Sequence, residues 1–279
     1  MMNKTQICCI FNLAAHYRAP IYNLLDKNLK CDFFITQWKV NPFKQMNFRS
    51  LEGFIGSGGI IFFKKFYWQK NSVRLIFKSY NKFLMTGEPY SISSWVILLF
   101  SKFLNKKVYL WSHGFYGNES KIKKIIKYVF FNLSEKVFVY GNHSRDLMIN
   151  NNFNPKKVSV IYNSLDYDLH ITLRNKFYSK PVFFDNKDPY ILYVGRIQKI
   201  KKIGLLIDAF SELISDNIKC NLLIVGPNTD NINFRISKNN KKLNSSIKFY
   251  GECYDDKLLS KIISNSFVCV SPGNVGLTA

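Results

Sequence analysis

The sequence predicts an α/β protein built from two doubly wound domains with parallel sheets. Two observations predict this fold class. Short apolar runs rich in β-branched residues recur along the 279 residues, and segments with the spacing of an amphipathic helix lie between them. Strands that are apolar along their whole length and alternate with helices belong to parallel sheets covered on both faces.

The expected strands are short apolar runs, six before a polar interruption and four after it. In chain order they are 7–11, 31–35, 83–85, 108–111, 137–140, 158–162, 190–194, 222–225, 247–250 and 267–270. Helices are expected where apolar residues stand three and four positions apart, which is the spacing of a buried helix face. These segments are 73–84, 122–130 and 203–213.

A polar stretch over 164–189 interrupts the alternation, with weak periodicity, two prolines and several charges. We therefore predict an N-terminal domain over 1–170, a linker over 171–188 and a C-terminal domain over 189–279. The last of these has about 90 residues, which is short for a domain. Because the sequence stops where a strand-to-helix turn begins, we expect the second domain to be incomplete.

The composition excludes whole-chain disorder, because 47% of the residues are hydrophobic and can bury a sizeable core. A net charge of +22 indicates a polyanionic partner, which is a nucleic acid, an acidic membrane or a phosphorylated substrate. The charge does not choose among them. A basic nucleic-acid-binding protein stays an alternative on charge alone, but no nucleic-acid-binding motif is present and we expect no nucleic-acid partner.

The six cysteines form no C-x-x-C pair, and no histidine lies at metal-ligand spacing from them. We therefore expect reduced thiols and no metal site. The apolar run 7–15 lacks a basic n-region and is interpreted as the first strand rather than a signal peptide. The longest other run, 95–100, is far too short to span a bilayer. These features favour a cytoplasmic protein that is soluble or peripheral on the inner face of the plasma membrane.

A candidate anion site follows the strand at 190–194. Gly195 ends this strand, Arg196 follows it, and Lys201 and Lys202 precede the helix at 203–213. In open α/β sheets ligands bind beyond the carboxyl ends of the strands, and a helix amino terminus flanked by Arg and Lys suits a phosphate. The alternative is a solvated basic loop.

The segment YILYVGRIQKIKKIGLLIDAF resembles the phosphate-binding segment, VGR-x4-KG-x-x-x-L-I-x-AF, of family 4 retaining glycosyltransferases. LLIVGPN, IKFYGEC and FVCVSPGNVGLTA resemble the next three strand-loop units of that family, in order. In the first half, YLWSHG and VSVIYNSLD resemble the family's His-Gly strand end and the segment that closes its first domain. YRAPIYNLL resembles the opening helix of some of its bacterial polysaccharide members. The resemblance implies the GT-B fold, in which two Rossmann-like domains face a cleft.

The resemblance also implies roles for individual residues. Arg196 and Lys201 would grip the diphosphate, and His113 would contact the transferred sugar, so these three are the candidate catalytic residues. Lys202 replaces the usual glycine, so the two lysines could exchange roles. The candidate donor-binding residues are Gly195, Arg196, Lys201, Lys202, Gly226, Gly251, Gly273, Asn274 and Val275.

His16 and Arg18 are candidates for the acceptor side. For His113 the alternative is a structural histidine in a strand-end turn. For Arg18 it is a helix-start residue that bonds neighbouring carbonyl groups.

By resemblance, the protein would transfer a sugar from a nucleoside-diphosphate donor to a glycan acceptor carried on a lipid. Anomeric configuration would be retained, and the reaction would need no metal or cofactor beyond the donor as co-substrate. One feature departs from the family. Its two glutamates, spaced E-x7-E, are absent: Gly273 stands where the first is expected, and the second would lie beyond Ala279. A non-catalytic remnant is therefore a further alternative.

Two basic segments predict a membrane-facing surface. Lys70, Arg74, Lys78 and Lys82 are four residues apart, on and beside the helix expected at 73–84. Lys121, Lys123, Lys124 and Lys127 accompany the helix expected at 122–130, and aromatic residues gather at 62–68. A basic amphipathic helix with aromatic neighbours suits an anionic membrane. The alternative is ordinary helices whose apolar sides cover the sheet. Gly56–Gly59 is interpreted as a turn.

Overall fold

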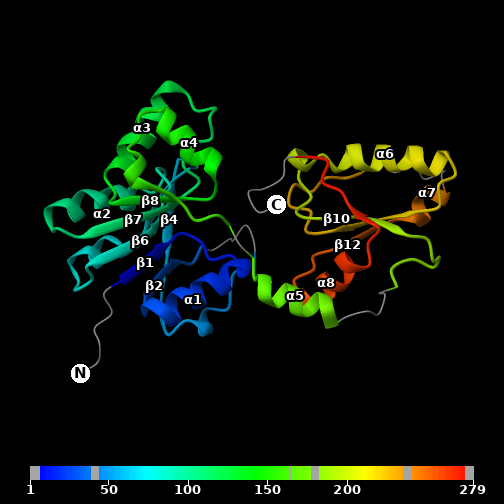
Figure 1. The fold of residues 1–279 in the computed structure, drawn as a ribbon, viewed down its shortest axis with the longest axis horizontal. Coiled ribbons are helices and arrows are strands. Elements are labelled where there is room, and N and C mark those ends of the chain that lie inside the picture. The colour runs from blue at the N-terminus through cyan, green and yellow to red at the C-terminus, as the bar shows by residue number, and fades with distance from the viewer. Residues whose placement is uncertain are drawn as a thin grey trace. The chain divides into compact units, whose positions relative to one another are not determined.

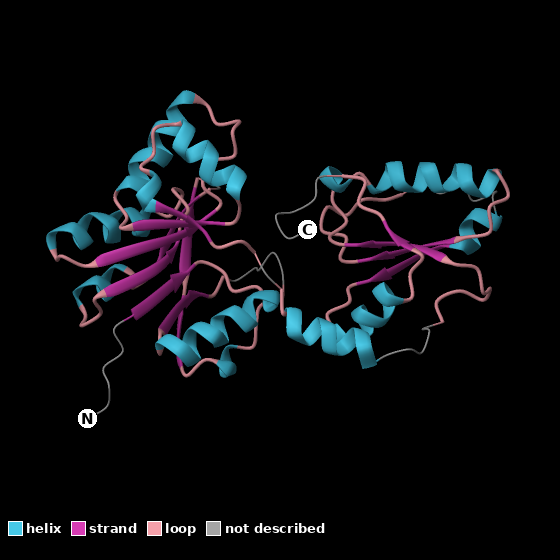
Figure 2. Ribbon diagram, in the orientation of Figure 1, coloured by secondary structure: helices cyan, strands magenta, loops and turns pink. Residues whose placement is uncertain are grey.

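The computed structural model describes residues 7–38, 44–63, 65–163, 165–176, 182–234 and 241–273. The chain divides into two compact units, Met1–Leu165 and Asp166–Ala279 (Figure 1). Each unit has its own parallel sheet with helices packed against it (Figure 2). The predicted α/β class with two doubly wound units is confirmed.

In the first unit, seven described strands form one parallel sheet in the order β3-β2-β1-β6-β7-β8-β9. Their bounds are β1 Ile7–Phe11, β2 Asp32–Thr36, β3 Gly53–Ser57, β6 Lys82–Thr86, β7 Lys107–Ser112, β8 Lys136–Val139 and β9 Val158–Val160. The interior strand β1, which lies between β2 and β6, alternates its side chains between two cores. Cys8 and Ile10 contribute to one, and Cys9 and Phe11 to the other, as the two-residue period of a strand requires.

Helices cover both faces of this sheet. They are α1 Ala19–Leu29, α2 Ile92–Phe103, α3 Lys121–Asn132 and α4 Asn142–Asn150. Tyr22 of α1 packs into the core on one face, while Ile97 of α2, Phe130 of α3 and Met148 of α4 pack into the core on the other. Local sequence sets the helix ends: Ser91, for example, caps α2 by accepting a hydrogen bond from the backbone N–H of Ser94.

The predicted helix over 73–84 is wrong. Only Val73–Phe77 is helical, as a short 3-10 helix, and Lys82 already belongs to strand β6. The apolar positions that suggested one helix belong to two elements, since Ile76 is buried in the 3-10 turn and Leu84 lies in the sheet. The basic residues from Lys70 to Lys82 therefore do not form a helical stripe.

The region before that turn is a β-hairpin. β4 (Gly59–Phe62) pairs antiparallel with β5 (Phe66–Gln69), and β3 ends at Ser57. The interpretation of Gly56–Gly59 as a turn is thus wrong, because Gly56 lies inside β3 and Gly59 begins β4. The aromatic residues at 62–68 precede no helix but build this hairpin, where Phe63 is 92% exposed.

Helix α3 is confirmed, but its apolar positions are not buried. Ile122 is 71% exposed and Ile125 is 64% exposed, and Ile126 and Val129 are also exposed. The helix instead packs on the sheet through its carboxyl-terminal half, where Phe130 and Phe131 are fully buried. The expectation that the isoleucine face covers the sheet is therefore wrong.

In the second unit, four described strands form a parallel sheet in the order β12-β11-β10-β13. The strands are β10 Tyr190–Val194, β11 Asn221–Val225, β12 Ile247–Gly251 and β13 Val268–Cys269, and the helices are α5 Tyr167–Lys176, α6 Ile203–Ser215, α7 Lys241–Ser246 and α8 Asp256–Ser264. The residues expected to be a linker, 171–188, begin within α5, which packs against α8. Across the described ranges, no helix is long and apolar enough to cross a membrane.

Candidate functional site

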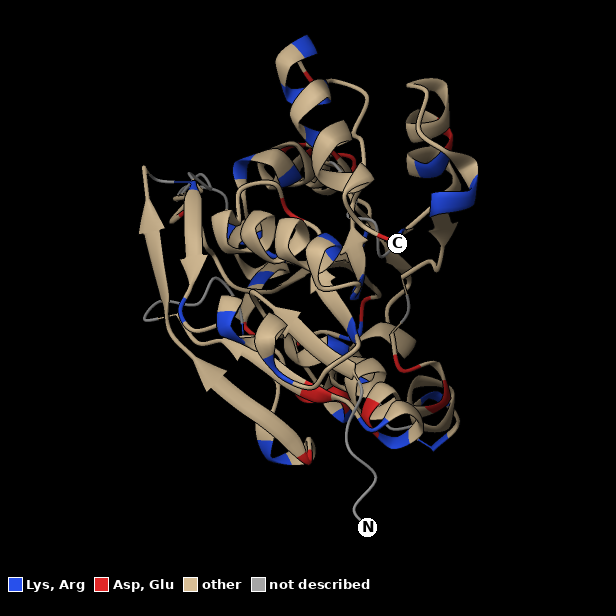
Figure 3. Cartoon of the chain, turned by 90° about the vertical axis from the view of Figure 1, so that its left-hand side faces the viewer, with Lys and Arg blue, Asp and Glu red and all other residues tan. Residues whose placement is uncertain are grey.

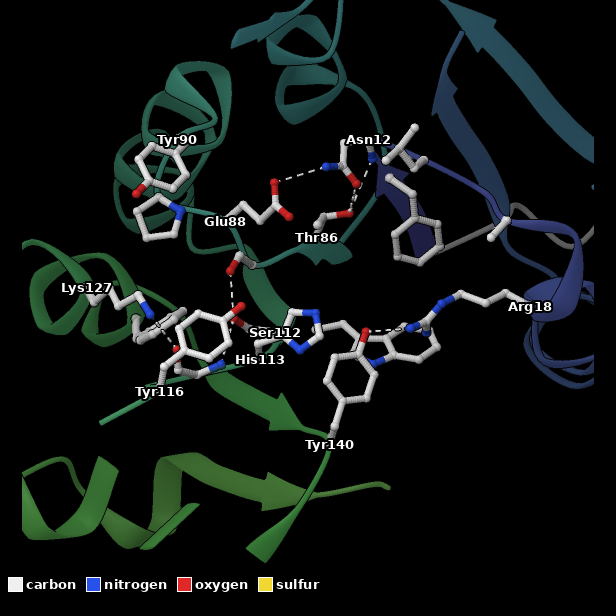
Figure 4. Close-up of a pocket in the computed structure, with 18 of the residues that line it drawn as sticks. Asn12, Arg18, Thr86, Glu88, Tyr90, Ser112, His113, Tyr116, Lys127 and Tyr140 are labelled. Carbon is white, nitrogen blue, oxygen red and sulfur yellow. Dashed lines mark hydrogen bonds between the residues drawn. The ribbon is translucent and has the colours of Figure 1, made fainter. Parts of the chain in front are cut away.

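The carboxyl ends of four adjacent strands in the first unit border a cavity of about 380 Å³. The strands are β1, β6, β7 and β8, and the cavity is lined by residues that end or follow them (Figure 4). In a doubly wound sheet this edge is where ligands bind. The polar and charged lining residues include Asn12, Arg18, Glu88, His113, Lys127 and Tyr140.

Glu88 is a largely buried acid in this pocket, two residues beyond β6. Its Oε2 atom accepts a hydrogen bond of 3.1 Å from Asn12 Nδ2 and another of 3.1 Å from the Tyr67 hydroxyl. Burial raises the pKa of Glu88, and the Tyr67 hydrogen bond opposes that rise only in part. A more basic carboxylate results, which is a stronger hydrogen-bond acceptor.

His113 follows β7 and lies between two tyrosine rings. Its ring centroid is 4.7 Å from that of Tyr140 and 5.9 Å from that of Tyr116. Partial burial lowers the pKa of His113, and the nearby positive charges of Arg18 and Lys127 lower it further. The neutral imidazole is therefore favoured near pH 7, although one side of the residue remains open to solvent.

Arg18 reaches the pocket from the start of α1. Its guanidinium lies 4.8 Å from the Trp111 ring and 5.2 Å from the Tyr140 ring, and it donates a 2.8 Å hydrogen bond to the Tyr140 hydroxyl. Stacking on aromatic faces holds a guanidinium rigidly while leaving other N–H groups free. The structure thus differs from the alternative in which Arg18 bonds carbonyl groups at a helix start.

A buried ion pair supports the opposite wall. Lys127 Nζ lies 2.6 Å from Glu119 Oε1 and donates to the Gly114 carbonyl at 2.9 Å. Burial alone would raise the pKa of Glu119, but hydrogen bonds from Lys127 and from the Tyr116 backbone outweigh it and lower the pKa. The pair fixes the loop that follows His113, because both ends of that loop are bonded to it.

The sequence-predicted residues of the first unit are only partly brought together. His113 and Arg18 line the same cavity, whereas His16 is half-buried beside Tyr17 and is not among its lining residues. Sequence reasoning missed Glu88. The available signal was its place just after a strand, because residues in that position gather at one edge of a parallel sheet.

The second unit carries three glycines at the corresponding edge of its sheet. Gly195, Gly226 and Gly251 end β10, β11 and β12 with positive φ angles of 153°, 142° and 84°. A Cβ atom on Gly226 would lie 1.9 Å from the Gly195 carbonyl oxygen. Only glycine fits at Gly226, which is buried against the Gly195 backbone, while Gly251 is exposed at the same edge.

Basic residues and a helix start lie beside these glycines. Arg196 is exposed just after β10, Lys201 is half-buried in a 3-10 turn (Lys199–Lys201), and Lys202 is the residue before α6. The Lys202 side chain makes no capping hydrogen bond at the amino terminus of α6, and the N–H groups of a first helical turn suit an anion. Lys202 is left-handed, with φ 53°, which explains why glycine suits this position.

Gly273 also belongs to this cluster. A Cβ atom there would lie 2.4 Å from the Ile200 carbonyl oxygen and 2.5 Å from Lys201 Cα, so its backbone packs directly on the basic turn. Asn274 and Val275 lie outside the described residues. Among the residues that are described, no three His, Cys, Asp or Glu side chains group in a way that could hold a metal ion.

Comparison with known proteins identifies the fold. Residues 175–276 match a family model described as "Glycosyl transferases group 1". The solved apo structure of the lipopolysaccharide outer core galactosyltransferase WaaB is similar, with 15% identity, 98% of this chain and 75% of that chain covered, and a TM-score of 0.59. The chain has the GT-B fold.

Two further structures show how wide this fold class is. Anabaena HepE in complex with UDP matches at 10% identity over 97% of this chain and 74% of that chain, with a TM-score of 0.62. A UDP-GlcNAc 2-epimerase from Methanocaldococcus jannaschii matches at 12% identity over 94% and 77%, with a TM-score of 0.54. No curated protein sequence matches the chain. These likenesses establish the fold, whereas the family match concerns the second unit.

Proposed function

We propose that the protein is a glycosyltransferase that moves a sugar from a nucleoside-diphosphate donor to a hydroxyl group of a glycan. The observation that carries this proposal is the cluster of Arg196, Lys201 and Lys202 at the start of α6, where the N-cap residue Lys202 makes no capping hydrogen bond. The glycine edge beside it lets a ligand approach the backbone closely. The family match to the second unit and the UDP in the Anabaena structure support a nucleotide ligand here.

The chemistry follows from the charges. Loss of a nucleoside diphosphate from the sugar develops negative charge on the departing phosphate. A guanidinium, an ammonium and helix N–H groups stabilise that charge without rearranging. We propose that Arg196 and Lys201 do this, with Lys202 able to replace Lys201, and that no metal or cofactor is needed. Retention of configuration and a lipid-linked acceptor complete the proposal, and both rest on the sequence resemblance.

Calorimetry with UDP and GDP on the full chain tests the donor site. We expect Arg196→Ala to weaken binding about 10- to 100-fold, the range for losing a hydrogen bond to a charged group. Arg174→Ala, which removes an exposed arginine from α5, is the matched control and should leave the affinity within about twofold. Equal affinities for the wild type and Arg196→Ala would remove the proposed site.

Product analysis tests the reaction itself. Incubation with UDP-sugars and a glycan mixture should yield a new glycosidic bond with the donor's anomeric configuration, unaffected by EDTA. Conversion of UDP-GlcNAc into its 2-epimer without transfer would instead favour the epimerase activity for which a structure of the same fold is named. Loss of activity in EDTA would contradict the metal-free mechanism.

We also propose that α3 docks the protein on the anionic inner face of the cytoplasmic membrane. Ile122, Ile125, Ile126 and Val129 form an exposed apolar stripe on this helix, and lysines flank it. The chain has 40 Lys and Arg residues against 18 Asp and Glu residues, coloured blue and red along the cartoon in Figure 3. An exposed apolar stripe beside lysines matches the acyl and headgroup layers of an anionic bilayer.

Vesicle co-sedimentation tests this docking. We expect binding to phosphatidylglycerol vesicles, little binding to phosphatidylcholine, and a loss of at least tenfold on Ile122→Glu/Ile126→Glu. The control is Leu205→Glu, which places the same charge on an exposed leucine of α6. Unchanged binding of the double variant would refute the role of α3.

A further inference from the structure

In the described structure, one carboxylate oxygen of Glu88 accepts hydrogen bonds and the other accepts none. Both hydrogen bonds that the described structure gives this side chain, from Asn12 and Tyr67, go to Oε2. Oε1 has no hydrogen-bond partner among the described residues, and Glu88 lines the cavity. A largely buried carboxylate with a spare oxygen at a cavity wall is an unfilled hydrogen-bond acceptor.

Asn12, which donates a hydrogen bond to Glu88, is itself oriented by Thr86 at the end of β6. The Thr86 hydroxyl donates to Asn12 Oδ1 at 3.1 Å and accepts from the Asn12 backbone N–H at 3.3 Å. With its oxygen engaged, the Asn12 amide must turn its NH₂ group toward Glu88 and the Tyr67 hydroxyl. This chain of bonds leaves Glu88 little rotational freedom. It is a preorganised arrangement rather than a mobile surface acid.

Another part of the cavity wall presents a positive group. In Figure 4, Glu88 lies above His113 and the Arg18 guanidinium lies to its right. Three ion pairs are found in the described part of the chain, and Arg18 takes part in none of them. Among the described residues its guanidinium donates one hydrogen bond, to the Tyr140 hydroxyl, so further N–H groups remain for a ligand.

Aromatic rings form much of the wall between these two groups. Trp111, Tyr116 and Tyr140 line the cavity with His113. Rings with an apolar face and a polar tip suit a ligand that has both C–H surfaces and hydroxyl groups. An oxygen acceptor, a cation and aromatic rings that line one cavity describe a receptor for a sugar that carries an anionic group.

We propose that this cavity binds the acceptor, that Glu88 receives a hydroxyl group of the acceptor sugar on Oε1, and that Arg18 binds an anionic substituent. The acceptor is then an acidic glycan, whose negative group is a carboxylate or a phosphate. Calling the bound sugar an acceptor rests on the proposed glycosyl transfer. The binding of an acidic sugar to this cavity does not depend on that proposal. Glu88 acts here by contact with the ligand, and Asn12 and Tyr67 are positioning residues.

Ligand-observed NMR titrations on the full chain test the inference, with glucose, glucuronic acid and glucose 6-phosphate as probes. We expect one or both acidic sugars to bind the wild type at least tenfold more tightly than glucose. Preference for glucuronic acid assigns the group at Arg18 to a carboxylate, and preference for glucose 6-phosphate assigns it to a phosphate. Equal binding of all three probes overturns the role of Arg18.

Two variants separate the two ends of the site. Arg18→Gln should abolish the preference for acidic sugars and leave the affinity for glucose within about twofold. Glu88→Gln should weaken all three probes about tenfold, because an amide replaces the charged acceptor. If Glu88→Gln binds the probes as the wild type does, the assignment of Glu88 is wrong.

A third variant and a donor measurement complete the design. Tyr67→Phe releases one bond to Oε2 but keeps the carboxylate, so we expect it to weaken the probes by a few-fold. Full affinity would show that positioning through Tyr67 is not needed. UDP affinity should be the same in all these variants. Failure of UDP to bind the wild type would contradict the proposed donor site and leave the sugar result standing.

Discussion

Replacing Lys127 by Met should destabilise the first unit, because it breaks a buried ion pair while keeping most of the side-chain volume. The lysine side chain is 15% exposed and that of Glu119 is 4% exposed, with 2.6 Å between the charged atoms. Removing one partner of a buried pair costs about 3–5 kcal/mol. Glu119 retains two backbone N–H bonds, of 2.7 and 3.0 Å, so we take the lower end, about 3 kcal/mol.

Thermal unfolding followed by circular dichroism measures this loss. For a unit of this size, about 3 kcal/mol corresponds to a Tm about 6–12 °C lower. The matched control is Lys107→Met, which breaks a 3.7 Å pair with Glu135 whose side chains are 58% and 47% exposed. Because exposed pairs contribute at most about 1 kcal/mol, the control should lower Tm by no more than a few degrees.

The loss of stability in Lys127→Met should depend on pH, and the sign of this dependence follows from Glu119. The folded state lowers the pKa of this acid below its ordinary value of 4.5, so its contribution is complete above that value. The contribution is lost as the pH falls through the folded pKa, because a protonated Glu119 no longer attracts Lys127. The stability difference should therefore be full at pH 7 and shrink below pH 4.5. An equal loss of stability in Lys127→Met and Lys107→Met would refute this reasoning. So would a loss in Lys127→Met that does not change with pH.

Three further outcomes are expected. Gly226→Ala should abolish detectable UDP binding, measured by calorimetry. The added Cβ atom would lie 1.9 Å from the Gly195 oxygen and force the glycine edge apart. Retained affinity would contradict a close ligand approach there. Lys202→Gly should raise the free energy of unfolding by about 0.5–1 kcal/mol in urea titrations, since it relieves a left-handed φ. A lower free energy of unfolding would contradict this explanation. In an NMR titration His113 should protonate below its ordinary value of 6.5, and Arg18→Gln should move that pKa upward; an unchanged value would exclude their coupling.

Periodicity predicted ten of the strands and the helices α3 and α6, because strand composition and helix spacing are local properties. All ten expected strands exist, with small shifts at their ends. The same locality explains the errors. Leu84 has helical spacing from Tyr80, but it lies in β6, because pairing with β1 and β7 outweighs local spacing. The isoleucines of α3 have the pattern of a buried face, and a pattern does not reveal whether anything covers it.

In the candidate site too, residues that are close in the sequence were predicted, and residues brought together from distant positions were not. Arg196 and Lys201 stand in one short segment with the strand and helix that present them, so sequence alone suggested their proximity. Glu88 was missed because its role depends on Asn12 and Tyr67, which are 76 and 21 residues away along the chain. Lys202 was noticed as a departure from glycine, but only the backbone angle explains why the departure matters.

The strand order of the first sheet also has a consequence for synthesis. The interior strand β1 is made before the other strands of this sheet, and its Ile7 pairs on one side with Lys82, which follows 75 residues later. At elongation rates of about 5–20 residues per second, this apolar strand waits about 4–15 s with one edge unpaired. The nascent chain is therefore exposed to edge-to-edge association during this interval. Slower translation, or the absence of chaperones, should reduce the yield of folded protein before any property of the finished molecule comes into play.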